Sequence, residues 1–407
     1  MWQLTDRKRE TGKIMTPVWN HTYNKREEEK KIMKNRMRKL LVTGLVTAMA
    51  ASAVACGSSA ETTSKTTAES TTEAATTVAA ETSPEAPSEE TASGELTPVT
   101  MYAIKDPQMS AAYYIALDQG YFEEEGLDLT TEVVSSGPDL ASYVAKGSNV
   151  YAMGTTYNLF AWLENDVPMK AVMPICNIGG TQDCAIREGL EITEDNVSEL
   201  EGLTVGMVPG AEAYLPLEKL FEEYGLDIST LTFVNLSASE QVAALSTGDI
   251  DIMVCWEPFV TNAVQDGAHY LCSGTKNFVA DPENGKDVNY GQFYTCLDAS
   301  EDVIESNPET LEKLCIALNK ATDFINDNRE EAISILAPIY EMDEDLLAII
   351  MDENDYTTEV NDNFIAGCET VAEYAVEAEV TSKVFTAEDY ADWSVLKTAL
   401  PEKLTVE

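Results

Sequence analysis

Two copies of one α/β pattern, about 100 residues apart, limit the fold of this chain more than any other feature. The segment FEEEGLD at residues 122–128 recurs as FEEYGLD at residues 221–227, an offset of 99. The turn at Gly147 recurs at Gly248, an offset of 101. Each copy reads strand, loop, helix, glycine corner, strand, loop, helix, glycine turn and strand. Two such units in one chain predict two α/β lobes that face each other across a cleft.

The second glycine turn leads into the strand that organises the candidate site. Residues 250–255 form a run, apolar apart from one aspartate, that has the length of a buried parallel strand. Trp256 and Glu257 follow at its carboxyl end, as Thr155 and Thr156 follow the matching strand of the first copy. Ligands of open α/β sheets bind at the carboxyl ends of the strands, so we expect the ligand at these positions.

The charge and residue inventory exclude several classes of function. Residues 56–407 carry 14 basic and 66 acidic side chains, a net charge of −52, which repels nucleic acid and anionic lipid headgroups. The chain has two histidines, His21 and His269, too few for a catalytic triad or a histidine-built zinc site. We therefore expect no nucleic-acid partner, no metal and no cofactor.

The N-terminal region is typical of an export signal. A basic cluster at residues 34–39 precedes an apolar run at 40–55, which is too short to span a membrane, and Cys56 follows. Because the ending AVAC resembles a bacterial lipobox, we expect a lipoprotein signal peptide at 33–55 and a lipid, with palmitate, on Cys56. Cleavage by an ordinary signal peptidase, which leaves the cysteine unmodified, is the alternative. Residues 1–32 are expected to be a non-native extension, since their KREEEKK segment can be encoded by purine codons alone, as in a ribosome-binding site.

Residues 56–96 are predicted to be a disordered tether rich in Ser, Thr and Glu. Such a segment has too little apolar surface to offset the entropy of ordering it. A flexible chain of this length spans roughly 35 Å, enough to hold a domain clear of a membrane. We therefore expect an extracytoplasmic protein that is lipid-anchored to the outer face of the cell membrane.

Three segments are expected after the tether. Residues 97–178 form the first part of lobe 1, residues 179–289 form lobe 2, and residues 290–407 form the second part of lobe 1 with the C-terminal helices. The segments at 177–183 and 290–297 are the expected crossings between the lobes. Lobe 1 is therefore expected to be discontinuous in sequence.

The periodicity of apolar residues predicts the individual elements. We expect strands at residues 100–104, 130–134, 150–154, 171–176, 203–208, 232–235 and 250–255. We expect helices at residues 111–119, 139–145, 240–246, 308–328, 330–340, 343–351 and 362–378. Ser110 and Asn361 are the expected N-caps of the first and the last of these helices.

Three motifs carry a resemblance to a known family. They are GYFEEEGLD at residues 120–128, GDIDIMVCWEP at residues 248–258 and NREEA at residues 328–332. Over about residues 97–395 the chain resembles the nitrate/sulfonate/taurine and thiamine-pyrimidine group of solute-binding proteins of ABC importers. The resemblance implies an α/β type II periplasmic-binding-protein fold that closes on its ligand by a hinge motion. It further implies docking on a membrane permease, which works with an ATPase. For a tethered binding protein of this kind we expect a monomer.

The candidate ligand contacts share one place in the fold, at strand ends and helix N-termini, where small residues leave backbone N–H groups free for an oxyanion. Trp256 could stack on a ring or bind a cation, whereas its alternative role is packing under the hinge. For each Ser or Thr the alternative is an ordinary N-cap. The set comprises Lys105, Asp106, Ser110, Ser135, Ser136, Gly137, Thr155, Thr156, Pro209, Gly210, Ala211, Glu212, Trp256 and Glu257.

The charges near these positions favour some solutes over others. Glu212 and Glu257 would oppose an anion, and Arg187 and Arg329 are the only arginines after Cys56. These features favour a zwitterion, an amine or a heteroaromatic ring over an inorganic anion. A taurine-like sulfonate stays possible, because its amine could meet Glu257 while helix N-termini hold the sulfonate.

The cysteines do not suggest a disulfide framework. Seven remain after Cys56, an odd number, and none forms a C-x-x-C pair. Most lie in apolar segments, so we expect buried free thiols. A bond between Cys176 and Cys184 is the alternative.

Two other functions fit parts of the sequence. One is a lipoprotein that senses its ligand for a receptor kinase instead of an importer. The other is an enzyme like the pyrimidine-precursor synthases, which resemble this family. The export signal and the single histidine of the lobes, His269, argue against the enzyme, so we expect a binding protein.

Overall fold

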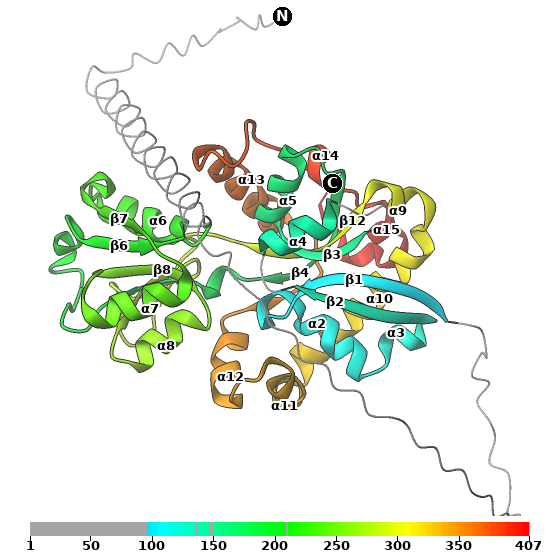
Figure 1. Ribbon diagram of the computed structural model, residues 1–407, viewed down its shortest axis with the longest axis horizontal. Coiled ribbons are helices and arrows are strands. Elements are labelled where there is room, and N and C mark those ends of the chain that lie inside the picture. The colour runs from blue at the N-terminus through cyan, green and yellow to red at the C-terminus, as the bar shows by residue number, and fades with distance from the viewer. Residues whose placement is uncertain (1–95, 135–136, 146–149, 209–210, 407) are drawn as a thin grey trace, which may run out of the picture.

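The computed structural model describes residues 96–406 apart from 135–136, 146–149 and 209–210 (Figure 1). The predicted extension, signal peptide, lipidated Cys56 and nearly all of the tether therefore lie outside the described residues. Four of the candidate ligand contacts also lie outside them: Ser135, Ser136, Pro209 and Gly210.

One sheet has six strands in the order β13-β4-β12-β3-β1-β2. Strand β1 pairs in parallel with β2 and β3, whereas β12 runs antiparallel to β3 and β4. The helices packed on this sheet complete what we call the six-stranded unit. Its strands are β1 (Thr97–Ile104), β2 (Leu127–Val134), β3 (Tyr151–Thr155), β4 (Met169–Asn177), β12 (Tyr294–Ser300) and β13 (Asp355–Tyr356).

The other sheet has seven strands in the order β11-β10-β9-β5-β8-β6-β7 and forms the seven-stranded unit, green in Figure 1. Strand β6 pairs in parallel with β7 and β8, and β5 runs antiparallel to β8. Its strands are β5 (Gln182–Ile186), β6 (Thr204–Met207), β7 (Thr232–Asn235), β8 (Ile252–Trp256), β9 (His269–Ser273), β10 (Lys276–Asn277) and β11 (Lys286–Asp287).

The sequence repeat is a repeat of structure. The order β3-β1-β2 in one sheet matches β8-β6-β7 in the other, and both triplets are parallel. The repeated corners end helices at Gly126 and Gly225, with φ of 77° and 67°, a left-handed conformation that favours glycine. Each triplet is extended by one antiparallel strand, β12 or β5. The two-lobed α/β fold predicted from the repeat is thus present.

The helices cover the sheets and fill the C-terminal third. The six-stranded unit begins with α2 (Pro107–Asp118), α3 (Tyr121–Glu124), α4 (Gly137–Val144) and α5 (Thr156–Glu164). The seven-stranded unit carries α6 (Tyr214–Tyr224), α7 (Ala238–Thr247) and α8 (Phe259–Gln265). The later helices are α9 (Glu301–Ser306), α10 (Pro308–Asp327), α11 (Arg329–Tyr340), α12 (Glu344–Asp352), α13 (Asp362–Glu377), α14 (Ala387–Tyr390) and α15 (Ser394–Ala399).

The N-cap of α2 differs from the prediction. The helix begins at Pro107, and the Asp106 side chain accepts the Gln108 N–H at 2.7 Å, so Asp106 is the cap and Ser110 is not. Proline has no N–H and its fixed φ suits the first helical position, which places the cap one residue before it. Asn361 was predicted correctly, since its side chain accepts the Phe364 N–H at 3.0 Å.

The two connections between the sheets lie side by side. The chain leaves β4 at Asn177 and enters β5 at Gln182, within the first crossing that the sequence predicts. The Ile178 N–H donates to the Phe293 carbonyl on the return connection at 2.7 Å. A Cβ on Gly179 would lie 2.6 Å from the Gly291 carbonyl oxygen, so only glycine allows this approach. The exact lobe bounds drawn from the sequence stay a prediction.

The seven cysteines after Cys56 are buried free thiols, as expected, and Cys176 is not bonded to Cys184. Cys184 instead lies opposite Cys272 in the pairing of β5 with β9. Within the described part of the chain, none of the helices has the length and apolarity needed to cross a bilayer.

Candidate functional site

The two units touch where the loop after β6 meets α13. The Tyr374 hydroxyl, on α13, donates to the Ala211 carbonyl oxygen at 2.9 Å. The Tyr374 ring lies 6.1 Å from that of Tyr157 on α5 and 6.2 Å from that of Tyr214 on α6, measured between centroids. We call Tyr157, Tyr214 and Tyr374 the tyrosine cluster. It joins side chains of both units, because α5 and α13 pack on the six-stranded sheet and α6 packs on the other.

Glu212 is a buried carboxyl beside the tyrosine cluster. It is 8% exposed, and its Oε2 has no hydrogen-bond partner among the described residues. Burial raises the pKa of Glu212 to about 8, because charging the carboxyl away from water is unfavourable. Its charge in turn raises the pKa of Tyr157 and Tyr374, which shows how near the three groups lie. Such a carboxyl can pair with a positively charged group that enters the site.

The first turn of α5 supplies further polar groups. The Thr155 side chain caps the helix, since its Oγ1 accepts the Asn158 N–H at 3.1 Å. Thr156 is 1% exposed, and neither its Oγ1 nor the Tyr157 hydroxyl has a hydrogen-bond partner within the described ranges. Buried polar atoms without partners are rare in folded proteins, so these atoms are candidates for solute contact.

A second group of polar side chains lies at the hinge, by which we mean the two connections between the sheets, residues 178–181 and 288–293. Gln108, 4% exposed on the first turn of α2, donates through Nε2 to the Glu257 carbonyl oxygen at 3.0 Å. Its Oε1 accepts from the Thr181 hydroxyl at 2.6 Å and from Gln182 Nε2 at 3.2 Å. The start of α2 is thereby tied to the first crossing and to the end of β8.

Glu257 already has protein partners for both carboxylate oxygens. Oε2 accepts the Thr261 N–H at 3.0 Å and Oε1 accepts the Tyr270 hydroxyl at 3.1 Å, in a side chain that is 2% exposed. Burial raises the pKa of Glu257 in spite of these bonds. Trp256 packs edge-on against Phe259, with ring centroids 6.3 Å apart, and stays partly exposed. These contacts give Glu257 a structural role in holding the start of α8.

The candidates around α2 have local partners. Lys105 is exposed and pairs with Glu341 at 3.4 Å. Asp106 caps the helix, and burial raises its pKa to about 6. Ser110 is fully buried, and its hydroxyl bonds to the Asp106 carbonyl at 3.0 Å and to the Tyr340 hydroxyl at 3.2 Å. Of the remaining candidates, Gly137 begins α4.

The structure thus brings the candidates into two groups. Thr155 and Thr156 come together with Ala211 and Glu212 through the tyrosine cluster. Asp106 and Glu257 belong to the hinge neighbourhood, where Gln108 bonds to both.

Sequence reasoning missed several residues of these groups. Tyr157 and Tyr214 lie one and two positions beyond the chosen Thr156 and Glu212, so a search for aromatic residues after each small-residue loop would have found them. Tyr374, in a helix far along the chain, gives no local signal. Also missed were Gln108 and Asp183, which is 3% exposed and has an Oδ2 without a partner in the described part of the chain.

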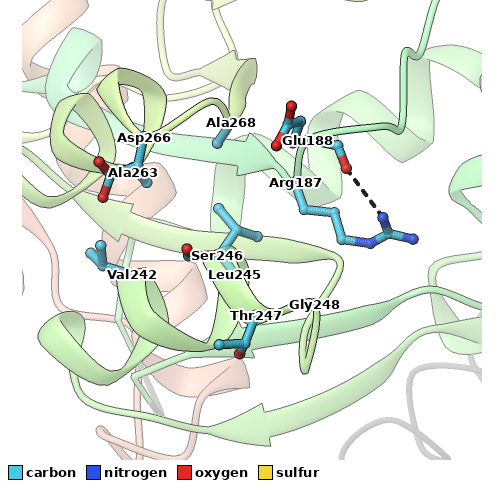
Figure 2. Close-up of a pocket in the computed structure, with 10 residues that line it drawn as sticks. All are labelled: Arg187, Glu188, Val242, Leu245, Ser246, Thr247, Gly248, Ala263, Asp266 and Ala268. Atoms are coloured by element: carbon cyan, nitrogen blue, oxygen red, sulfur yellow. Dashed lines mark hydrogen bonds between the residues drawn. The ribbon is translucent and has the colours of Figure 1, made fainter.

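A separate pocket on the seven-stranded unit contains an arginine (Figure 2). Arg187 pairs with Asp251 at 2.8 Å, and its Nη1 donates to the Glu188 carbonyl at 3.2 Å. Because the charge of Arg187 is already paired, this pocket is a poor anion site. It also lies at the start of β8, opposite the end that carries Trp256. Over the described ranges, no group of three or more His, Cys, Asp or Glu side chains could hold a metal ion.

The two sheets, joined by paired crossings, have the two-lobed α/β fold of type II periplasmic binding proteins. The solved structure of the periplasmic aliphatic sulphonate binding protein SsuA from Escherichia coli aligns with a TM-score of 0.60 at 18% identity, covering 74% of this chain and 92% of that one. Residues 108–332 match the family described as NMT1/THI5 like, and the chain belongs to that family. The resemblance inferred from the three motifs is confirmed.

Two further proteins bear on the function. A Bacillus subtilis protein that carries the name aliphatic sulfonates-binding protein is 20% identical over 321 residues, 76% of this chain and 91% of the relative. A structure of the desulfurization enzyme DszB has a TM-score of 0.58 at 14% identity, covering 75% of this chain and 99% of that one. The fold therefore occurs both in binding proteins and in an enzyme.

Proposed function

We propose that the chain is an extracytoplasmic solute-binding lipoprotein that captures a small organic solute between its two lobes. It delivers the solute to the permease of an ABC importer, which is driven by an ATPase. The family, the two-lobed fold and the relatives named for sulfonate binding support this proposal. Cys56 and residues 56–96 would anchor a monomeric binding domain to the outer face of the membrane.

The observation that carries the proposal is a set of buried polar atoms at the contact between the lobes for which the described part of the chain offers no partner. Glu212 Oε2, beside the tyrosine cluster, and the hydroxyl of Tyr157, within it, are both buried and have no hydrogen-bond partner among the described residues. An unpaired buried polar group costs about 1–3 kcal/mol, so a bound solute that satisfied it would gain affinity. The solute classes that remain are sulfonate or taurine-like and pyrimidine or amine-like.

Thermal unfolding of residues 96–407 with a solute panel tests the proposal. A solute at 100 times its Kd should add about 2.7 kcal/mol of stability, a shift of several degrees. Solution X-ray scattering on the same samples should show a smaller radius of gyration for the complex, because the lobes close. Solutes that neither raise the Tm nor change the scattering would count against a binding protein.

The lipid anchor has its own test. We expect the protein expressed with its signal to carry the mass of an acylated Cys56 and to fractionate with membranes. Globomycin, which blocks lipoprotein signal cleavage, should leave the precursor uncut. An unmodified cysteine at the mature N-terminus would contradict the anchor.

An enzyme on this fold is the second candidate, favoured by the likeness to DszB. The seven described cysteines are buried, and burial raises the thiol pKa at six of them, which keeps them protonated and unreactive. His269 is exposed on β9. We therefore infer a binding role, and expect no desulfurization of biphenyl-2-sulfinic acid, the compound bound in a structure of a DszB mutant. Turnover would instead support the enzyme.

The third candidate function is a lipoprotein that senses its solute for a receptor kinase. It would close on its solute as an importer subunit does, so binding alone does not separate the two. Reconstitution with the permease and ATPase should give solute-dependent ATP hydrolysis if the chain serves an importer.

A further inference from the structure

We propose that the solute carries a positively charged nitrogen, which pairs with the Glu212 carboxylate against the rings of the tyrosine cluster. The inference rests on the proposed function and deepens it, because it names the chemical class of the solute. The same contact between the lobes would thus be a cation site.

The Glu212 carboxylate is the anchor of this site. It is more than nine-tenths buried, and one of its oxygens makes no hydrogen bond within the described residues. A buried carboxylate is costly unless it is paired with a cation or accepts hydrogen bonds. A charged ammonium or protonated ring nitrogen supplies both, whereas a sulfonate or nitrate supplies neither.

The tyrosine rings provide the second element of a cation site. The faces of aromatic rings carry partial negative charge and attract ammonium groups that lie within about 6 Å of the ring centre. The three rings adjoin one another at 6.1 and 6.2 Å, and the Tyr374 hydroxyl bonds to the residue before Glu212. The rings and the carboxylate come from both lobes, so a cation held between them would favour the closed arrangement.

The charges around the cluster have the sign that a cation needs. Glu218 and Glu377 raise the pKa of Tyr214 and Tyr374, and Glu212 raises that of Tyr157. Among the described residues, no lysine or arginine contributes to the pKa shifts of these three tyrosines. An anionic solute would meet repulsion here once Glu212 is ionised.

The two arginines of the mature chain are engaged elsewhere. Arg187 pairs with Asp251 in the separate pocket of the seven-stranded unit. Arg329 lies over the Tyr356 ring, 5.2 Å from its centroid. Neither is therefore in place to hold an anion beside Glu212.

Isothermal titration of residues 96–407 at about pH 8.5, where Glu212 is mostly ionised, tests the inference. The panel pairs three cations, choline, putrescine and protonated 4-aminopyridine, with the neutral analogues 3,3-dimethylbutanol, 1,4-butanediol and 4-methylpyridine. Ethanesulfonate and nitrate are the anions. We expect at least one cation to bind and its neutral analogue to bind at least about 30-fold more weakly, as loss of a buried charge pair requires.

Variants assign the binding to the site. Glu212→Gln should weaken the cation by at least about 30-fold. Tyr157→Leu should weaken it by roughly 2- to 30-fold, the value of one ring face. The matched control is Glu222→Gln, which removes an exposed carboxylate of α6 that pairs with Lys219 at 2.9 Å and should change affinity less than about 2-fold.

A proton count gives an independent readout. The Glu212 carboxyl, with a pKa of about 8, is largely protonated at pH 7, so a bound cation should release close to one proton. Titrations in phosphate and in Tris, which differ in ionisation enthalpy, measure this release. The other titratable groups near the site are Glu218, Glu377 and the facing tyrosines, and the pKa values of these tyrosines stay raised above 10. We therefore assign the released proton to Glu212.

The outcomes separate this inference from the proposed function. Binding of ethanesulfonate or nitrate alone, or cation affinity and proton release unchanged in Glu212→Gln, would overturn the cation site and leave the binding protein standing. If no member of the panel binds, both fail. Circular dichroism and a Tm at pH 5 equal to that of the unaltered protein verify that Glu212→Gln folds, because glutamine mimics the protonated carboxyl.

Discussion

At the scale of single residues, burial without a partner decides the behaviour of Glu212. The carboxyl has an ordinary pKa of 4.5 in the unfolded chain and about 8 in the folded one, through desolvation alone. The folded state therefore holds the proton more tightly, and unfolding releases it between these two pH values. Stability contributed by the protonated carboxyl is present below pH 4.5 and is lost as the pH rises toward 8.

Glu212→Gln should abolish the decrease in stability that the solute-free protein shows as the pH rises toward 8. The rise in pKa from 4.5 to about 8 corresponds to roughly 5 kcal/mol, at about 1.4 kcal/mol per unit. We expect the variant to match the unaltered protein at pH 5 and to be more stable at pH 9. Urea unfolding at both pH values measures the difference. Equal stabilities at pH 9 would show that the carboxyl is solvated.

At the scale of elements, α2 is held to the hinge by one side chain. Gln108 connects the first turn of the helix to Thr181 and Gln182 on the first crossing and to the Glu257 carbonyl at the end of β8. The first turns of α2 and α8 lie in the same region, where the Asp106 and Glu257 side chains accept backbone N–H groups of these helices. The polar side chains of this region therefore line the hinge and also hold α2 and α8 in position.

Gln108→Leu should destabilise the protein by about 1–3 kcal/mol, because the leucine leaves the buried Gln182 amide without its partner. Chemical unfolding measures this. Gln119→Leu, at the C-terminal cap of the same helix and only partly buried, is the control and should cost less than about 0.5 kcal/mol. If both variants lost the same free energy of unfolding, Gln108 would not connect α2 to the hinge as proposed.

At the scale of the whole molecule, two similar α/β units meet at the hinge and at the tyrosine cluster. The hinge is covalent and closely packed, with Gly179 against Gly291. The contact at the cluster consists of side-chain groups, which include the hydrogen bond from Tyr374 to Ala211 and the contacts of the Tyr374 ring with Tyr157 and Tyr214. Opening and closing of the lobes is therefore expected to break the cluster while the hinge persists.

Tyr374→Phe should shift the solute-free protein toward an open arrangement. It keeps the ring contacts and removes one hydrogen bond, worth about 0.5–1.5 kcal/mol, which changes the population of the open state by roughly 2- to 13-fold. Solution X-ray scattering should show a larger radius of gyration. The control Tyr114→Phe removes a hydroxyl from α2, within the six-stranded unit. A radius unchanged by Tyr374→Phe would mean that other contacts hold the lobes.

The sequence predicted the fold well because its signals are local. The glycine corners at Gly126 and Gly225 and the apolar runs of the strands recur in both units, and the predicted strand at 232–235 and helix at 308–328 match β7 and α10 to within one residue. The start of α2 was wrong by four residues, because Asp106 before a proline outcompeted Ser110 as the cap.

The candidate site was only partly accessible from the sequence. The sequence indicated Thr156 and Glu212 as candidates, because each lies just beyond the end of a predicted strand. Nothing in the sequence near Tyr374 or Gln108 marks either as a partner of the other lobe.

The sequence by itself therefore determined the order of elements, the internal repeat and the family, all of which depend on residues close together in the chain. Tertiary structure alone decided which side chains meet. Tyr374 and Ala211 lie 163 residues apart, and Gln108 and Glu257 lie 149 apart. Such contacts form only when two crossings bring the sheets together, so the burial of Glu212, and with it the charge of the site, is a property of the assembled lobes.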